Sequence, residues 1–146
     1  MPESKIWEFN KGEWTEAYVF LRLLGDGRIY GANEHLEKDE RLYIDIVNIY
    51  KYEAEKIYRF AREISDSAAS VSGYENEQRF IIMTPPELSD RAGMLYAAIR
   101  NVKSGDRKFR VPEVQDYLQR LKFSSPKVPA LPKQYENLSS STKRNR

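Results

Sequence analysis

The sequence contains no cysteine and a single histidine, His35. The lack of cysteine excludes a disulfide framework, cysteine-ligated metal sites and a cysteine nucleophile. His35 lies in the polar stretch NEHLEKD, where a lone histidine is usually an ordinary surface residue. A catalytic triad built on histidine is therefore disfavoured, and carboxylates remain the main side chains available for chemistry.

The chain also lacks any long apolar run. Its first residues, MPESKIWEFNKGEW, contain no apolar core of signal-peptide length, and no segment approaches the length of a membrane span. We therefore expect a cytoplasmic protein with no membrane partner. The 146 residues suffice for one compact domain, and ten tyrosines in an ordinary apolar background are typical of globular proteins.

The net charge of +2 conceals a basic end. A basic end is a weak indication of nucleic-acid binding, and a solvated end explains it equally well. Prolines and serines also punctuate this part of the chain. We predict one domain over residues 1–123 and a flexible tail without packed elements over 124–146. The charges of the tail are Lys127, Lys133, Lys143, Arg144 and Arg146 against Glu136.

Residues 12–24 are predicted to form an amphipathic helix, because apolar residues recur at the spacing of one helical face. Asn10 with Glu13 three positions later is a capping-box pattern. Gly25 and Gly27 are expected to end the helix. The buried face should contain Trp14, Ala17, Tyr18, Phe20, Leu21 and Leu24.

Three strands are predicted over about 42–50, 54–63 and 77–84, where β-branched and aromatic residues are frequent. A tight connection should lie near 51–54, although helix is a competing interpretation across 51–64 because alanine, glutamate and lysine are good helix formers. Residues 28–40 are expected to be a loop or short helix, and 64–74 mostly loop.

Two more helices are predicted in the second half of the chain. Thr84 before Pro85, with Glu87 three positions later, marks one start, and Pro112 marks the other. Expected buried residues are Leu88, Ala92, Leu95, Tyr96 and Ile99, then Val114, Tyr117, Leu118 and Leu121. The fold class is therefore α+β: an N-terminal helix, two to three antiparallel strands, two C-terminal helices and a disordered basic tail.

Carboxylates could support metal-dependent phosphodiester cleavage, which uses hard oxygen ligands and a nearby lysine. Asp106-Arg107-Lys108 fits an acid-x-Lys pattern, with Asp90 as an upstream partner. The context disfavours this pair, because Asp106 follows Ser104-Gly105 between two helices and Asp90 lies in a helical first turn. Glu3-Ser4-Lys5 is weaker still, at the terminus.

The start of the first helix, Lys11-Gly12-x-x-x-Glu16, is the stronger candidate. Glycine there lets the backbone come close to a ligand, and Glu16 lies one turn further on the same side. A carboxylate beside a helix N-terminus suits a divalent metal or a phosphate neighbourhood. The structural alternative is that Gly12 is merely small and that Glu13 and Glu16 offset the helix dipole.

The stretch FNKGEWTEAYVFLRLLGDGRIYGANEHLEK resembles the start of the HpaII-type restriction endonuclease family. Those proteins open with a similar Asn-Lys-Gly-Glu-Trp-Ser/Thr-Glu helix, followed by a Leu-Leu-x-x-Gly turn and a Tyr-x-Ala segment. Residues 94–121 are similar to two later helices of the family. The resemblance covers roughly residues 8–123 in scattered blocks.

The resemblance implies a type II restriction endonuclease of the PD-(D/E)XK class, acting in a restriction-modification system. It implies Mg²⁺-dependent cleavage of double-stranded DNA at a short palindrome, CCGG for the family's namesake. Glu16 is then the metal-supporting catalytic carboxylate and Lys11 a phosphate contact, with Glu13 a weaker candidate. A homodimer and a complementing C-terminal polypeptide both remain open as partners.

The chain departs from the family pattern after Phe123. The family's catalytic Asp and acid-x-Lys segments are expected further along, where this sequence reads KQYENLSSSTKRNR. We therefore expect a truncated enzyme, equivalent to the N-terminal portion of the family and inactive alone. Weak, salt-dependent DNA binding should persist.

Two other hypotheses remain open. In a non-catalytic DNA-binding or partner-binding module, tyrosines of IYKYEAEKIYRF would stack on bases while Lys51, Lys56 and Arg59 contact phosphates. In that module Lys143, Arg144 and Arg146 would add the charge of the tail. In a complete small enzyme, Glu16 and Asp106-x-Lys108 would meet in space.

Overall fold

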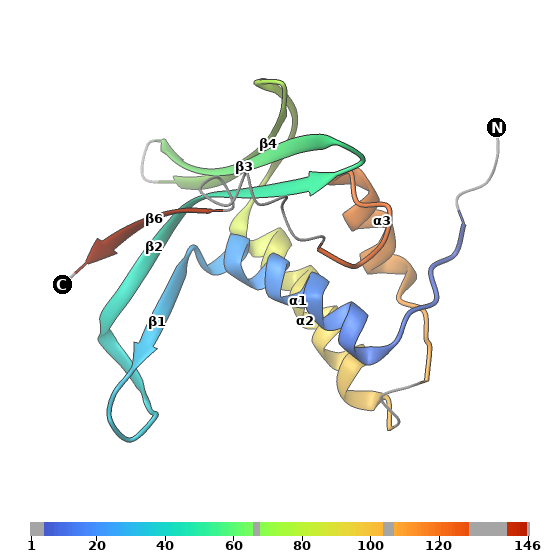
Figure 1. The fold of residues 1–146 in the computed structure, drawn as a ribbon, viewed down its shortest axis with the longest axis horizontal. Helices are drawn as coiled ribbons and strands as arrows, with labels where there is room; N and C mark the ends of the chain where they lie inside the picture. Colours follow the sequence, from blue (N-terminus) through green and yellow to red (C-terminus); the bar gives the residue numbers. More distant parts are fainter. Residues whose placement is uncertain (1–4, 66–67, 104–106, 129–139, 146) are drawn as a thin grey trace.

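The computed structural model describes residues 5–65, 68–103, 107–128 and 140–145. A layer of helices packs beneath an antiparallel sheet, so the α+β class predicted from the sequence is confirmed (Figure 1). The elements in chain order are α1 (Lys11–Asp26), β1 (Arg28–Ala32), β2 (Lys38–Glu53), β3 (Lys56–Ser65), β4 (Ala68–Glu75), β5 (Gln78–Met83), α2 (Pro85–Asn101), α3 (Pro112–Arg120) and β6 (Ser140–Asn145).

Helix α1 forms as predicted. The Asn10 side chain accepts a hydrogen bond from the Glu13 N–H, and the Glu13 carboxylate accepts one from the Asn10 N–H, which completes a capping box. Gly27 ends the helix in a left-handed conformation, with φ of 69°, and its N–H donates to the Leu23 carbonyl. Of the predicted apolar face, Tyr18 is only partly buried, and the others are buried: Trp14, Ala17, Phe20, Leu21 and Leu24.

The sheet has the order β1-β2-β3-β4-β5, and β6 pairs with β2 outside this path. Strand β2 is long enough to have different neighbours along its length: residues 38–45 pair with β1, and residues 48–53 pair with β3. At the junction, the Ile46 N–H donates to the Gly27 carbonyl at 2.9 Å. This bond ties the middle of β2 to the end of α1.

The prediction of a loop or short helix at 28–40 is wrong, because β1 and the start of β2 form a hairpin there. Its cross-strand pairs are Arg28 opposite Asp45 and Tyr30 opposite Tyr43. The first pair forms an ion pair of 2.8 Å, and the two rings lie 6.1 Å apart. Such pairs stabilise a hairpin whose single strands show little apolar alternation.

The prediction of a loop at 64–74 is also wrong, because β4 begins at Ala68 and lies between β3 and β5. Its small residues fit beneath large neighbours. A Cβ on Gly73 would lie 2.8 Å from the Ile81 Cγ2 and 2.9 Å from the Phe80 ring, so only glycine fits there. The aromatic rings of adjacent strands cover the glycine, an arrangement that a local propensity reading misses.

The strands at β2, β3 and β5 and the two later helices confirm their predictions, which removes the helical alternative for 51–64. Thr84 caps α2 by accepting from the Glu87 N–H, and Pro112 begins α3. Tyr96 was predicted to be buried but is 47% exposed. Its ring stacks at 5.6 Å on Tyr18, outside the core.

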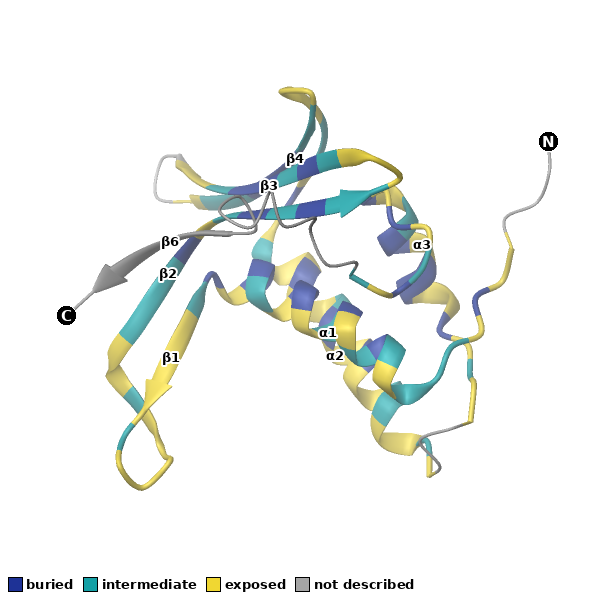
Figure 2. Cartoon of the chain, viewed as in Figure 1, coloured by how far each residue is buried: buried dark blue, intermediate teal, exposed yellow. Residues whose placement is uncertain are grey.

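One continuous core joins the helices to the sheet (Figure 2). Phe20 of α1 meets Phe60 of β3 and Phe123 edge-to-face, at 5.3 and 5.0 Å. Trp14 lies nearer the start of α1, and its indole N–H donates to the Phe109 carbonyl at 3.1 Å. These contacts fix α1 between the sheet and the α2–α3 connection.

Residues 124–128, which we call the strap, pack on the domain although no packed element was predicted after Phe123. The Ser124 N–H donates to the Glu53 carboxylate at 3.1 Å, Pro126 is buried, and the Val128 N–H donates to the Glu16 Oε1 at 3.0 Å. Residues 140–145 form β6 on β2. Residues 129–139 and 146 of the predicted tail lie outside the described residues, and the domain boundary at 123 stays a prediction.

Candidate functional site

The front of α1 holds the residues that the sequence singled out: Lys11, Gly12, Glu13 and Glu16. Glu13 is fully engaged, since one oxygen accepts the Asn10 N–H and the other lies 3.1 Å from the Lys127 ammonium. The Asn10 hydrogen bond, followed by Lys127, lowers the pKa of Glu13. Glu13 therefore serves the capping box and the strap, in agreement with its weaker ranking as a site residue.

Glu16 is exposed, one turn after Gly12, with one oxygen accepting the Val128 N–H. Lys11 is half-buried, and its carbonyl accepts from the Thr15 hydroxyl at 2.7 Å. A Cβ on Gly12 would meet nothing closer than the Asn10 Oδ1, at 3.6 Å. No contact within the described chain requires glycine there, so the space above Gly12 is open to a ligand.

The described residues do not supply a ligand set for Mg²⁺. A magnesium site needs one or two carboxylates free to face the ion, whereas Lys127 already places its ammonium at the Glu13 carboxylate. Asp90 pairs with Arg91 at 2.7 Å. Within the described ranges no three Asp, Glu, His or Cys residues form a group that could hold a metal. Glu16 as a metal-supporting carboxylate stays a prediction.

Of the Asp106-x-Lys108 pattern only Lys108 can be placed, because Asp106 lies outside the described residues. Lys108 is exposed and lies close enough to the front of α1 to contribute to the lowered pKa of Glu13. The approach follows from the pairing of Phe9 with Phe109 in an isolated bridge. The connection between α2 and α3 is therefore a neighbour of the front of α1, as the third hypothesis required for its lysine.

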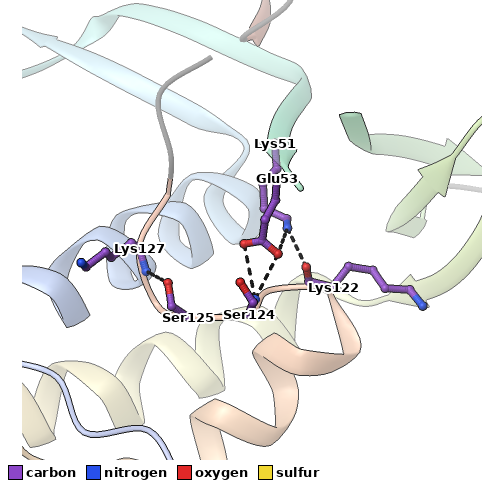
Figure 3. Close-up of polar contacts among 6 residues, drawn as sticks. All are labelled: Lys51, Glu53, Lys122, Ser124, Ser125 and Lys127. Carbon is purple, nitrogen blue, oxygen red and sulfur yellow. Dashed lines mark hydrogen bonds and ion pairs between the residues drawn. The ribbon is translucent and has the colours of Figure 1, made fainter. Parts of the chain in front are cut away.

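Lys51 was predicted to contact phosphate, but its side chain is completely buried and faces the turn after α3 (Figure 3). Its ammonium donates to the Lys122 carbonyl at 2.8 Å, lies 3.5 Å from the Glu53 carboxylate, and sits 4.6 Å from the centre of the Tyr58 ring. Burial lowers the pKa of Lys51 to about 8, and Glu53 opposes that shift. In this conformation Lys51 stabilises the turn after α3 and cannot reach a surface phosphate.

Lys56 and Arg59 lie on β3, and both are paired with acids. The Lys56 ammonium lies 3.3 Å from Glu75. Arg59 donates to Asn48 and Glu77 and stacks 4.3 Å from the Tyr74 ring. On the backbone of β6, Lys143 and Arg144 lie opposite Asp45 and Ile44, while Arg146 is outside the described residues. The DNA-binding role of all five stays a prediction.

A cleft with a volume of about 810 Å³ lies between the β1–β2 hairpin and the end of α1, and we call it the hairpin cleft. Sequence reasoning missed its cations, because they come from four separate elements and form no local motif. The Gly-Asp-Gly-Arg run after α1 was the available signal, but it was interpreted only as a helix stop. The lining residues are Arg22, Asp26, Gly27, Arg28, Tyr30, Lys38, Asp45, Ile46, Val47, Arg62 and Ile64.

Comparison with known proteins decides the family. The family model described as HpaII restriction endonuclease matches residues 10–136, from the cap of α1 to beyond the strap. This chain belongs to the HpaII restriction endonuclease family. The resemblance inferred from the front of α1 is thereby confirmed.

A curated relative agrees with this assignment. The chain is 29% identical over 121 residues to the type II restriction enzyme HpaII of Haemophilus parainfluenzae. The match covers 83% of this HpaII-family chain and 32% of that enzyme, so the chain spans about a third of the relative's length. No solved structure matches the chain, and the likeness to PD-(D/E)XK nucleases stays a prediction. Among the described residues, no helix is both long and apolar enough to cross a bilayer.

Proposed function

We propose that this chain acts in the sequence-specific cleavage of double-stranded DNA by a type II restriction endonuclease, within a restriction-modification system. The observation that carries the proposal is the family match over residues 10–136. That match includes the front of α1, where the space above Gly12 is open and Glu16 is exposed. The family implies a divalent metal for the cleavage step, with Mg²⁺ as our proposed ion.

We further propose that this chain, taken alone, binds DNA but does not cleave it. Its carboxylates near the front of α1 are held by other groups: Glu13 by the cap and Lys127, and Glu16 by the Val128 N–H. Cleavage needs carboxylates that face a metal and a water. Those groups would come from a homodimeric partner or a complementing polypeptide.

The test uses the whole chain of 146 residues. Binding to a fluorescein-labelled duplex is measured by anisotropy at increasing salt, with one duplex containing CCGG and one with that tetranucleotide scrambled. We expect measurable binding whose log K falls linearly with log salt, by about 0.9 for each phosphate contacted. Absence of duplex binding at low salt would contradict the proposal.

Cleavage is followed in parallel on a supercoiled plasmid with MgCl₂, and an EDTA sample serves as the control. We expect no nicked or linear product from this chain alone. Mg²⁺-dependent cutting that co-elutes with the protein peak in chromatography would show that the chain holds a complete metal centre. The proposal that this chain alone binds DNA without cleaving it would then be wrong.

A further inference from the structure

The hairpin cleft gathers four cations on one concave surface: Arg22 of α1, Arg28 of β1, Lys38 of β2 and Arg62 of β3. Two acids, Asp26 and Asp45, also line it. Cations therefore outnumber acids two to one, and β1, which lies beside the cleft, is mostly exposed (Figure 2). A concave surface with an excess of positive charge concentrates anionic ligands.

Arg28 is held in a fixed orientation. Its Nε donates to the Asp45 carboxylate at 2.8 Å, and its guanidinium stacks 3.7 Å from the centre of the Tyr43 ring. The side chain is nevertheless 38% exposed. A guanidinium already anchored through Nε and a ring face loses little freedom when its outer N–H groups bind a phosphate.

Arg62 forms the floor of the cleft, where the end of α1 meets the sheet. Its Nη1 donates to the Leu24 and Gly25 carbonyls, the unpaired acceptors of the helix terminus. A Cβ on Gly27 would clash with this guanidinium, so glycine at 27 both caps α1 and leaves room for Arg62. Burial lowers the pKa of Arg62, but the group remains a cation.

Lys38 and Arg22 are the two more exposed cations of the cleft. The Lys38 side chain is 58% exposed, with its ammonium 4.2 Å from the centre of the Tyr30 ring and 4.0 Å from Glu40. Arg22 pairs with Asp26 at 3.2 Å and is 46% exposed. Pairs this exposed contribute little stability, so their charges remain available to an external anion.

We propose that the hairpin cleft binds the phosphate backbone of double-stranded DNA. The inference rests on the proposed function and goes further, because it assigns the contact to four residues outside the front of α1. Arg28 and Arg62 supply guanidinium groups oriented by their own hydrogen bonds, and Lys38 and Arg22 supply more exposed cations. These contacts position the duplex and carry no sequence information by themselves.

Two observations favour DNA over an acidic protein segment. Three of the four cations are arginines, whose planar fork matches phosphate geometry. In addition, β6 runs along the stretch of β2 that lines the cleft, with Lys143 opposite Asp45. The sequence positions of Lys143 and Arg144 therefore adjoin the strand that lines the cleft, and added basic residues beside it favour a polyanion.

The test compares two lysines of equal exposure. Lys38 in the cleft is 58% exposed and Lys56 on β3 is 57% exposed, and each lies near one glutamate. The variants Lys38→Glu and Lys56→Glu therefore change the net charge equally at matched sites. We measure duplex affinity by anisotropy at several salt concentrations and verify folding by circular dichroism.

We expect Lys38→Glu to weaken binding about tenfold and to lower the salt slope by about 1. Lys56→Glu, which tests the competing β3 contact predicted from the sequence, should weaken binding less than about threefold, and a larger loss there than in Lys38→Glu would overturn the assignment to the cleft. Equal losses in the two variants would show diffuse attraction to net charge and would overturn the assignment. Unchanged binding in Lys38→Glu would place the duplex elsewhere, while the proposed function would stand. If the unaltered chain fails to bind duplex DNA, both proposals fail together.

A second variant, Arg28→Lys, keeps the charge but removes the fork and its stack on Tyr43. We expect affinity to fall about threefold to tenfold with little change in the salt slope, and no loss would contradict the role of the oriented guanidinium. Polyglutamate serves as a competitor. If it displaces the duplex at equal charge concentration and binds with the same dependence on Lys38, the partner is an acidic protein and the assignment to DNA is wrong.

Discussion

The two halves of β2 have the same backbone conformation but opposite surroundings. Residues 46–53 bury Ile46, Ile49 and Lys51, while residues 38–45 form the hairpin with β1 and include no buried residue (Figure 2). Residues 46–53 are stabilised by packing in the core, and residues 38–45 are stabilised by cross-strand pairs such as Arg28–Asp45. The difference implies that stability and the proposed DNA binding depend on different parts of one strand.

The largest expected effect is beside the packed half, at Phe60 of β3, which lies opposite Ile49 of β2. Phe60 is completely buried and meets the rings of Phe20 and Phe80 edge-to-face. Phe60→Ala should lower the free energy of unfolding by about 3–5 kcal/mol, measured in urea, because it leaves a cavity in the core. Tyr30→Ala in the hairpin should cost less than about 1 kcal/mol. Equal losses would contradict the separation.

The next effect concerns the pH dependence of stability. Lys51 titrates near 8 in the folded protein against an ordinary 10.5, so between these values the unfolded chain binds the extra proton. Stability should therefore rise from pH 8 to 10 by about 2 kcal/mol, as the cost of the buried charge is relieved. Above this range, the raised pKa values of Tyr58 and Tyr117 act in the opposite direction.

Lys51→Met tests this assignment, because it removes the titrating group and keeps an apolar side chain of similar length. Urea unfolding at pH 8, 9 and 10 should show the rise in the unaltered chain and a flatter profile in the variant. The charge of Glu53 and its bond to Ser124 are retained in both proteins. A rise of equal size in the variant would show that another group is responsible.

Two glycines, one at each end of α1, should change stability by smaller amounts and in opposite directions. Gly27→Ala should lower the free energy of unfolding by about 1–2 kcal/mol, because alanine is strained at a φ of 69° and displaces Arg62. Gly12→Ala should leave stability unchanged or raise it by up to about 1 kcal/mol, since its Cβ would meet only the Asn10 Oδ1, at an ordinary contact distance of 3.6 Å. Duplex binding that falls in Gly12→Ala without loss of stability would locate DNA above the front of α1 as well.

The smallest effect on stability is expected in the exposed half. Lys38→Glu should change the free energy of unfolding by less than about 0.5 kcal/mol, since its pair with Glu40 is exposed and long. The same variant carries the largest expected loss of duplex binding. A destabilisation above 1 kcal/mol, measured in urea, would show that the hairpin contributes to the packed core after all.

Elements with a local signal could be predicted from the sequence. The capping box of Asn10 and Glu13, the glycine stop at Gly27 and the Pro112 start each act through neighbouring residues, and all three form. Strands β1 and β4 could not be predicted in the same way. β1 depends on pairs across the hairpin, and β4 depends on rings from adjacent strands above Gly73.

The site residues show the same limit. The front of α1 was visible as a motif and led to the family, but the burial of Lys51 depends on the Lys122 carbonyl and the Phe123 ring, which are distant in sequence. The sequence reasoning assumed that a lysine at position 51 would be exposed, but Lys51 is buried. The cations of the hairpin cleft come together only once α1, the hairpin and β3 are assembled.

The strap changes where a shortened form of this protein should end. A chain cut after Phe123 would lose the Ser124 bond to β2 and both contacts to α1, at Glu13 and Glu16. It would also uncover the surface beneath Pro126. The smallest unit that retains these contacts runs through Val128, and a protease acting on the folded protein should spare the peptide bonds between 123 and 128.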